Sequence, residues 1–322
     1  MLIKIEDAVK GVLAGNRRSI AKAITIVEND TAETQKLVAK IFPHTGKARI
    51  IGVTGASGSG KSTLIEKIVR EFRQNDKTVG VVAVDPTSPF TGGAFLGDRI
   101  RMQRLYTDKD VFIRSMATRN YAGGIAKATK YAVKILDAAG KDIIIIETVG
   151  AGQSDVEIIK VAQTVVVVHA PGLGDEIQAI KAGIMEIADI FVVNKADREN
   201  ANKTIMDIQA NLRMNNKERA WRPPVLGTVA TTGEGIKDLV EALEEHRCFM
   251  ENNPDYKRDM LKERTEAELI EEMKDKVSRL IVQKLRNEGK LDDLLQKILE
   301  RRIDPASAAE ELVKKVLNLA KT

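Results

Sequence analysis

The chain has 322 residues, of which 43% are hydrophobic and 30% charged, and this composition is typical of a globular protein with a sizeable core. Its 51 basic and 46 acidic side chains leave a net charge of +5, and only 4% of residues are aromatic, so neither a polybasic nucleic-acid surface nor a base-stacking platform is indicated. One cysteine, Cys248, and three histidines exclude a disulfide framework and a Cys/His-rich metal centre, which favours a reducing, cytoplasmic location.

The first 46 residues carry a helical pattern. Apolar side chains recur at helical spacing through residues 20–27, and Asp30 with Glu33 predicts a capping box for the next helix. No run approaches the roughly 20 apolar residues of a membrane span. We therefore expect an N-terminal helical extension over residues 1–46 and no association with a membrane.

Short runs rich in β-branched residues alternate with helix-like stretches across residues 47–247. The predicted strands are RIIGVT (49–54), TVGVVAVD (78–85), VFIRS (111–115), DIIIIET (142–148), TVVVVHA (164–170), DIFVVN (189–194) and PPVLGTV (223–229). Continuously apolar strands that alternate with helices predict an α/β fold, with a mainly parallel sheet covered by helices on both faces.

A phosphate-binding loop is predicted at residues 55–62, GASGSGKS, which match G-x-x-x-x-G-K-[ST] between a strand and a helix. Backbone N–H groups and the helix N-terminus attract the phosphates, Lys61 is expected to reach the β- and γ-phosphates, and Ser62 to bind Mg²⁺. The residues predicted to hold the phosphates are Gly55, Ser57, Gly58, Ser59, Gly60, Lys61, Ser62 and Thr63.

The sequence NKAD at residues 194–197 indicates the base. The Asp197 carboxylate can accept hydrogen bonds from N1–H and the exocyclic amine of guanine, whereas adenine presents an acceptor at N1 and would be repelled. Asn194 is expected to tie loops together, and Lys195 to lie along the base. A later segment, VATTGEG, is expected to close over the base through Val229, Ala230 and Thr231. The motifs together predict GTP and GDP rather than ATP as ligands.

Three carboxylates, Asp85, Asp98 and Glu147, are expected to surround the metal with Ser62, because two of them end predicted parallel strands that face the phosphate loop. The alternative is that they cap helices or carry loop charges. Lys61, Asp85 and Glu147 are the predicted catalytic residues.

The segment expected to position the attacking water departs from the usual GTPase pattern. In the GTPase pattern D-x-x-G-Q, Glu147 replaces the aspartate and Gly150 is in step, but Gln153 follows the glycine by three residues instead of one. Gly150 and Gln153 are predicted to belong to a switch that senses the nucleotide. No separate arginine finger is assigned, although Arg99, Arg101 and Arg104 are close in sequence. This incomplete apparatus predicts slow GTP hydrolysis that a partner or a dimer rearrangement accelerates.

Residues 248–322 are densely charged and helical in pattern. These helices either pack on the GTPase domain or form an arm that dimerises, since a long amphipathic stretch after a complete α/β core often needs a partner surface.

Three long segments resemble the MeaB/ArgK family of P-loop GTPases: AVDPTSPFTGGAFLGDRIRM, ETVGAGQSDVEI and HAPGLGDEIQAIKAGIMEIADIFVVNKAD. The resemblance implies an N-terminal helical extension, a GTPase domain and a C-terminal dimerisation arm. It also implies a chaperone that gates cofactor loading of an adenosylcobalamin-dependent acyl-CoA mutase, such as methylmalonyl-CoA mutase, and protects or reactivates that enzyme.

The segment PGLGDEIQAIK resembles the additional switch of this family, with Asp175 and Lys181 at its charged positions, although an ordinary strand-to-helix loop is the alternative. Two other functions are alternatives. A nickel-delivery metallochaperone GTPase usually needs the Cys or His clusters that this chain lacks. A transport-associated ATPase or kinase conflicts with the guanine motif at residues 194–197.

Overall fold

The computed structural model describes residues 4–85, 102, 105–117, 127–148, 150, 157–172, 185–214 and 220–319. The chain divides into two compact units, Met1–Pro254 and Asp255–Thr322. The predicted division into residues 1–46, 47–247 and 248–322 stays a prediction about domain organisation.

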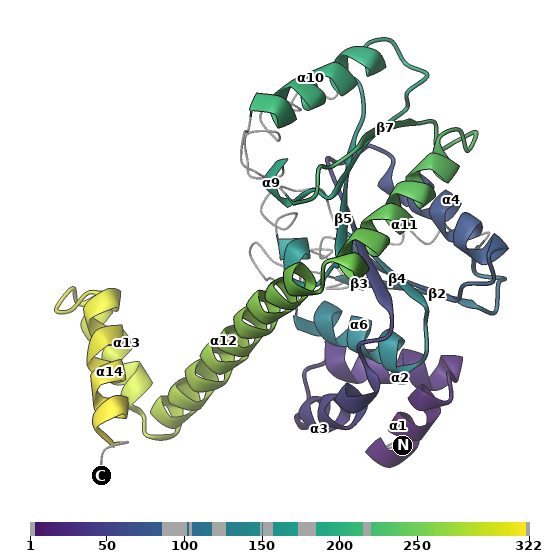
Figure 1. Ribbon diagram of the computed structural model, residues 1–322. Helices are drawn as coiled ribbons and strands as arrows, with labels where there is room; N and C mark the ends of the chain where they lie inside the picture. Colours follow the sequence, from purple (N-terminus) through teal and green to yellow (C-terminus); the bar gives the residue numbers. More distant parts are fainter. Residues whose placement is uncertain are drawn as a thin grey trace. The chain divides into compact units, whose positions relative to one another are not determined.

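The first unit is built on a seven-stranded sheet, in which every neighbouring pair of strands is parallel (Figure 1). The strands are β1 (Arg49–Thr54), β2 (Val79–Asp85), β3 (Val111–Ala117), β4 (Ile143–Glu147), β5 (Thr164–His169), β6 (Ile190–Asn194) and β7 (Val225–Thr228). Their spatial order is β3-β2-β4-β1-β5-β6-β7. The predicted α/β fold class is therefore confirmed.

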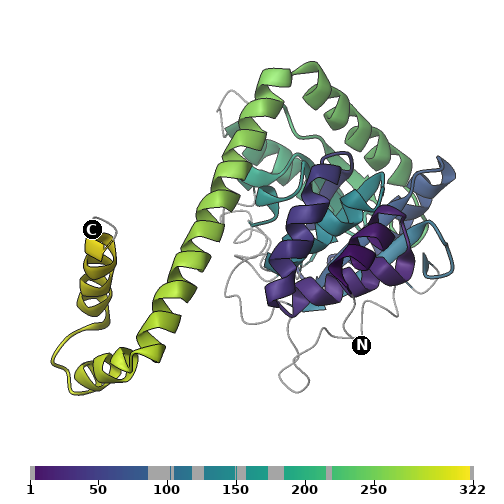
Figure 2. The same ribbon diagram turned by 90° about the horizontal axis from the view of Figure 1, so that it is seen from below.

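Helices cover both faces of the sheet (Figures 1 and 2), and β4 shows why its sequence is apolar throughout. Ile143 and Ile145 belong to the apolar cluster beneath α4 (Lys61–Gln74) and α11 (Ile236–Asn252). Ile144 and Ile146 belong to the cluster beneath α6 (Lys127–Ala138). Because successive strand side chains point to opposite faces, a strand buried on both sides needs an apolar residue at every position.

Three α-helices precede the sheet: α1 (Ile5–Leu13), α2 (Arg17–Glu28) and α3 (Ala32–Ile41). They pack together and against α6. The apolar pattern predicted over residues 20–27 is the buried stripe of α2, so that prediction is confirmed.

The predicted capping box at Asp30 and Glu33 is wrong. The N-cap of α3 is Thr31, one residue later than predicted. Glu33 is then the second helical residue instead of the third, so it cannot complete the reciprocal pair of a capping box.

A carboxylate joins the N-terminal helices to the sheet. Asp137, at the end of α6, accepts hydrogen bonds from the backbone N–H groups of Gly46 (2.5 Å), Lys47 (3.1 Å) and Ala48 (2.9 Å). These three donors belong to the segment that leads into β1, so Asp137 sets where the chain enters the sheet.

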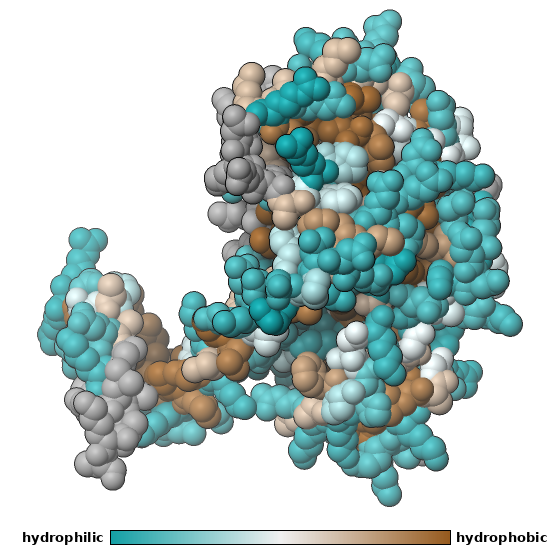
Figure 3. Space-filling view, in the orientation of Figure 1, coloured by the Kyte–Doolittle hydropathy of each residue, from teal (hydrophilic) through white to brown (hydrophobic). Residues whose placement is uncertain are grey.

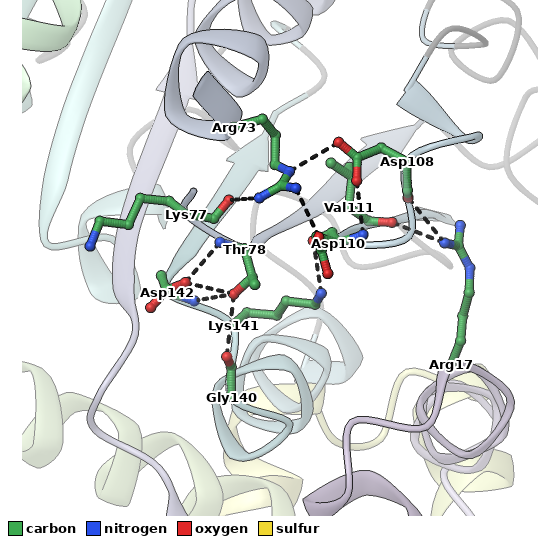
Figure 4. Close-up of polar contacts among 10 residues, drawn as sticks. All are labelled: Arg17, Arg73, Lys77, Thr78, Asp108, Asp110, Val111, Gly140, Lys141 and Asp142. Carbon is green, nitrogen blue, oxygen red and sulfur yellow. Dashed lines mark hydrogen bonds and ion pairs between the residues drawn. The ribbon is translucent and has the colours of Figure 1, made fainter. Parts of the chain in front are cut away.

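A polar cluster lies at the amino ends of the strands, where β2 and β3 begin, and Figure 4 shows its contacts. The Arg73 guanidinium of α4 pairs with Asp108 at 2.9 Å and with Asp110 at 2.8 Å. Arg17, the first residue of α2, donates a hydrogen bond to the carbonyl oxygen of Val111 at 3.1 Å. The cluster therefore holds the entry to β3 between α4 and the N-terminal helices.

The other helices described in the first unit are η1 (Phe42–His44), η3 (Glu157–Lys160), α9 (Met185–Ile187) and α10 (Ala201–Met214). The second unit is helical, with α12 (Pro254–Asn287), α13 (Lys290–Leu299) and α14 (Pro305–Leu319). Among the described residues, no helix is long and apolar enough to cross a membrane.

Candidate functional site

The phosphate loop connects β1 to α4, as predicted. Lys61 is the first residue of α4, and its buried Nζ donates to the carbonyl oxygens of Gly55 (2.7 Å) and Ala56 (3.2 Å). The first turn of α4 carries no acidic side chain. Its backbone N–H groups have no acceptor within the helix, so they and the helix dipole favour an anion at this end.

The predicted phosphate contacts differ in exposure along the loop. Ser57 and Gly58 are exposed, Gly60 and Thr63 are half-buried, and Ser59 is buried. Their phosphate-binding roles stay predictions.

An oxygen-donor pair lies beside the loop. The Ser62 hydroxyl, in the first turn of α4, donates to Glu147 Oε1 at 2.7 Å, and both side chains are buried. Because the Ser62 hydroxyl donates its proton to Glu147, the lone pairs of its oxygen can bind a cation. A hydroxyl and a carboxylate beside a phosphate site are hard donors of the kind that Mg²⁺ takes, so the two residues fit this ion.

The other predicted metal ligands are located only in part. Asp85 ends β2, and in the register of β2 with β4 it lies two positions beyond Ala83, the partner of Glu147. The Asp85 side chain and the whole of Asp98 lie outside the described residues, as do Arg99, Arg101 and Arg104.

Gly150 lies directly against the phosphate loop. Its φ is +77°, and a Cβ at this position would overlap the Gly55 carbonyl oxygen and lie 2.7 Å from Lys61 Nζ. Only glycine tolerates both the conformation and the approach. The prediction that Gly150 senses the nucleotide stays a prediction, and Gln153, Asp175 and Lys181 lie outside the described residues.

Asn194, at the end of β6, links three segments. Its Nδ2 donates to the Ser59 carbonyl oxygen at 2.8 Å, and its Oδ1 accepts from Ala230 N–H at 3.1 Å and from the Thr228 hydroxyl at 3.2 Å. A Cβ on Gly60 would overlap Asn194 Nδ2, so the glycine admits the amide. Asn194 thus holds the phosphate loop against the loop after β7.

Lys195 and Asp197 of the same motif differ in exposure. Lys195 is half-buried, has φ +59° and donates from Nζ to the Gly58 carbonyl oxygen at 2.7 Å, while Asp197 is exposed. The loop after β7 is a tight turn in which Val229 pairs with Glu234. In this loop Val229 and Ala230 are buried and Thr231 is exposed. Recognition of guanine by this loop and by Asp197 stays a prediction.

Three threonines of the site were not predicted. The Thr148 hydroxyl donates to Thr54 Oγ1 at 2.8 Å, behind the phosphate loop, and Thr228 donates to Asn194. Each stands at or just after the end of a buried strand. Their position in the sequence could have indicated them. Hydroxyl residues at the carboxyl ends of apolar strands are expected to lie close together, because those ends meet at one edge of a parallel sheet.

Comparison with known proteins gives a consistent result. The profile of the family described as methylmalonyl-CoA mutase-associated GTPase MeaB matches residues 20–286. A putative GTPase of Pyrococcus abyssi is 49% identical, covering 97% of this chain and 97% of its own length. The mouse protein named methylmalonic aciduria type A homolog, mitochondrial, is 33% identical, covering 74% of this chain and 62% of its own length.

Among solved structures, one described as a LAO/AO transport system kinase has a TM-score of 0.73 at 22% identity, covering 98% of this chain and 100% of its own. Similarity at this level of identity supports the fold alone.

Proposed function

This chain belongs to the MeaB family of P-loop GTPases, and from that premise we propose that it is a chaperone of an adenosylcobalamin-dependent acyl-CoA mutase, such as methylmalonyl-CoA mutase. In this proposal, GTP binding and hydrolysis gate cofactor loading and protect or reactivate the mutase in the cytoplasm. The family match over residues 20–286 carries the proposal, because the family description names association with that enzyme. The name of the mouse relative supports it.

Within this proposal, Lys61 and the first turn of α4 bind the phosphates of GTP. The Lys61 ammonium already lies over the loop, held by two backbone carbonyl oxygens, so it is oriented before a charge-assisted contact with phosphate forms. Ser62 and Glu147 would hold Mg²⁺, with Asp85 and Asp98 as further predicted ligands. The bound ion neutralises charge on the phosphate oxygens.

Guanine would be read by the exposed Asp197 carboxylate, with Lys195 along the base. The bond from Lys195 to Gly58 already joins this segment to the phosphate loop. We expect turnover to be slow in the isolated protein, because the glutamine is displaced from the usual pattern and no arginine finger is assigned.

We further propose that α12 forms the arm of a homodimer. Ile270, Met273, Val277 and Leu280 recur at spacings of three and four residues and are 43% to 62% exposed. Figure 3 shows apolar side chains gathered along this helix. Such spacing forms the seam of a coiled coil, and a second copy of the chain would supply the matching seam.

The arm is tested by sedimentation equilibrium. The double variant Met273→Glu, Leu280→Glu is expected to be monomeric, while Ser278→Glu, an exposed position outside the seam, keeps the dimer. A wild-type protein that is monomeric at micromolar concentration, with and without nucleotide, would contradict the proposed arm.

The chaperone function is tested by the lifetime of the mutase. During turnover with its substrate, the mutase should lose activity several-fold more slowly when this chain and GTP are present. The Lys61→Ala variant should give no protection, whereas Lys67→Ala, a half-buried lysine farther along α4, should protect normally. Equal inactivation with and without the chain would rule the function out.

A further inference from the structure

Two buried hydroxyl groups join the ends of β1 and β4. The Thr148 Oγ1 donates to Thr54 Oγ1 at 2.8 Å, and these side chains are 3% and 0% exposed. The backbone N–H of Thr148 also donates to the Val53 carbonyl oxygen at 3.1 Å, one step beyond the regular ladder of the two strands. Thr54 is followed directly by Gly55 of the phosphate loop.

Thr148 lies beside the residues that face the predicted metal and phosphate positions. Thr148 follows Glu147, whose carboxylate accepts from Ser62, and it precedes Gly150, which lies against Lys61. Because successive residues of an extended chain point to opposite faces, Glu147 points toward α4 and Thr148 toward the other face of the sheet. The same short stretch is therefore held from both faces, by Ser62 on one and by Thr54 on the other.

We propose that Thr54 and Thr148 are positioning residues that set the distance between the phosphate loop and Glu147, and thereby the strength with which Mg²⁺ retains the nucleotide. This inference rests on the Mg²⁺ role proposed above for Ser62 and Glu147. Neither threonine is assigned a contact with nucleotide or metal; both act through the residues next to them.

The oxygen-oxygen distance gives the proposal its physical content. Two hydroxyl oxygens approach to 2.8 Å because they share a proton, whereas two methyl carbons rest at about 3.5–4.0 Å. Valine in both positions would thus move the two chain segments apart by roughly 1 Å. A displacement of about 1 Å in a site that depends on fixed geometry is sufficient to weaken binding or catalysis by a large factor.

A loss of stability has to be measured apart from the positioning effect. Either Thr→Val change removes the shared hydrogen bond, and methyl groups in both positions also crowd a buried contact, so a lower unfolding temperature is expected for the double variant. The Mg²⁺ response is therefore compared at a temperature at which thermal unfolding curves show both proteins to be folded.

The experiment measures release of a fluorescent GDP analogue in Mg²⁺ and in EDTA. We expect Mg²⁺ to slow release from the wild-type protein. In the Thr54→Val, Thr148→Val double variant, the ratio of the release rate in EDTA to that in Mg²⁺ should be about tenfold smaller than in the wild type. Release in EDTA should change less than about twofold, since the phosphate loop and Asn194 are intact. Thr54→Ser and Thr148→Ser keep the hydroxyls and should behave as wild type, as should Thr265→Val, an exposed threonine of α12.

The release rates distinguish a wrong positioning role from a wrong metal site. If the double variant keeps the wild-type ratio of release rates, the positioning role is wrong and the metal site stands. If Mg²⁺ has no effect on the wild-type protein, the proposed metal site is wrong and this inference with it. Should the double variant not fold, the single Thr148→Val variant, compared with Thr148→Ser, decides the same question.

Discussion

The side-chain amide of Asn194 donates to the Ser59 carbonyl oxygen at 2.8 Å and so joins the segment predicted to read guanine to the phosphate loop. The same amide accepts from Ala230, which belongs to the loop predicted to close over the base. Three loops from different strand ends thus depend on one buried side chain, so base recognition and phosphate binding are expected to be coupled.

Replacing Asn194 with alanine is the first test of this coupling. It leaves the Ser59 carbonyl and the Ala230 N–H without their partner, so we expect affinity for GTP and for GDP to fall by roughly tenfold or more. Asn211→Ala is the matched control, because that amide donates to a backbone carbonyl on its own helix, α10. Equal affinities of the two variants by calorimetry would show that the link is not needed for binding.

The Asp197→Asn variant tests how the base is read. The carboxylate accepts two hydrogen bonds from guanine, whereas asparagine can accept one and donate one, which suits the second carbonyl of xanthine. We expect the preference for GTP over xanthosine triphosphate to fall by at least roughly a hundredfold. Asp207→Asn, an exposed aspartate of α10, serves as the control. Unchanged discrimination would place base recognition elsewhere.

Much of this architecture is readable from the sequence, because the signals are local. All seven strands were predictable as apolar runs, and Ile143 to Ile146 show why, since each face of the sheet has its own core. Motif spacing likewise predicted that Asn194 ties loops together.

Contacts between residues far apart in sequence were not readable. Nothing near Arg49 indicates that its buried guanidinium donates to the Leu243 carbonyl oxygen and pairs with Glu244. The contact of Thr54 with Thr148, 94 residues away, depends on strand order, which the individual strand sequences do not encode. The start of α3 at Thr31 shows that even local capping signals compete, since two neighbouring residues are both good N-caps.

Acidification should destabilise the protein through His169. Burial at the end of β5 lowers the pKa of His169 from 6.5 to about 4, because the charged imidazolium loses its hydration. The unfolded state binds more protons between these values, so stability is complete above pH 6.5 and falls as the pH drops toward 4. The loss at this residue is at most about 3–4 kcal/mol.

The test is chemical denaturation of wild type and His169→Gln across this pH range. The glutamine variant should lose less stability between pH 6.5 and 4 than the wild type, whereas His44→Gln, at an exposed position, should follow the wild type. Parallel pH profiles for wild type and His169→Gln would contradict the assignment.

Asp142 provides a second test of charge, at the amino edge of the sheet. Partial burial raises the pKa of Asp142, but hydrogen bonds from the Thr78 N–H (2.7 Å) and hydroxyl (2.8 Å) outweigh it, and the net pKa lies below the ordinary 3.8. The stabilisation is therefore present above about pH 4 and lost as the pH falls through the lowered pKa. Figure 4 shows both contacts.

Asp142→Asn keeps the shape and removes the charge. Because the carboxylate is exposed and screened by solvent, we expect a loss of about 1 kcal/mol in the free energy of unfolding at pH 7. The difference from wild type should shrink below pH 3. A difference that does not change with pH would show that charge is not the cause.

The most direct test of the account is the rate of GTP hydrolysis by the purified protein, alone and with an adenosylcobalamin-dependent acyl-CoA mutase from the same genome. The account predicts slow hydrolysis of GTP that the mutase accelerates, no comparable hydrolysis of ATP, and no activity in the Lys61→Ala variant. GTP hydrolysis that no such mutase changes would leave the GTPase in place and contradict the proposed chaperone function.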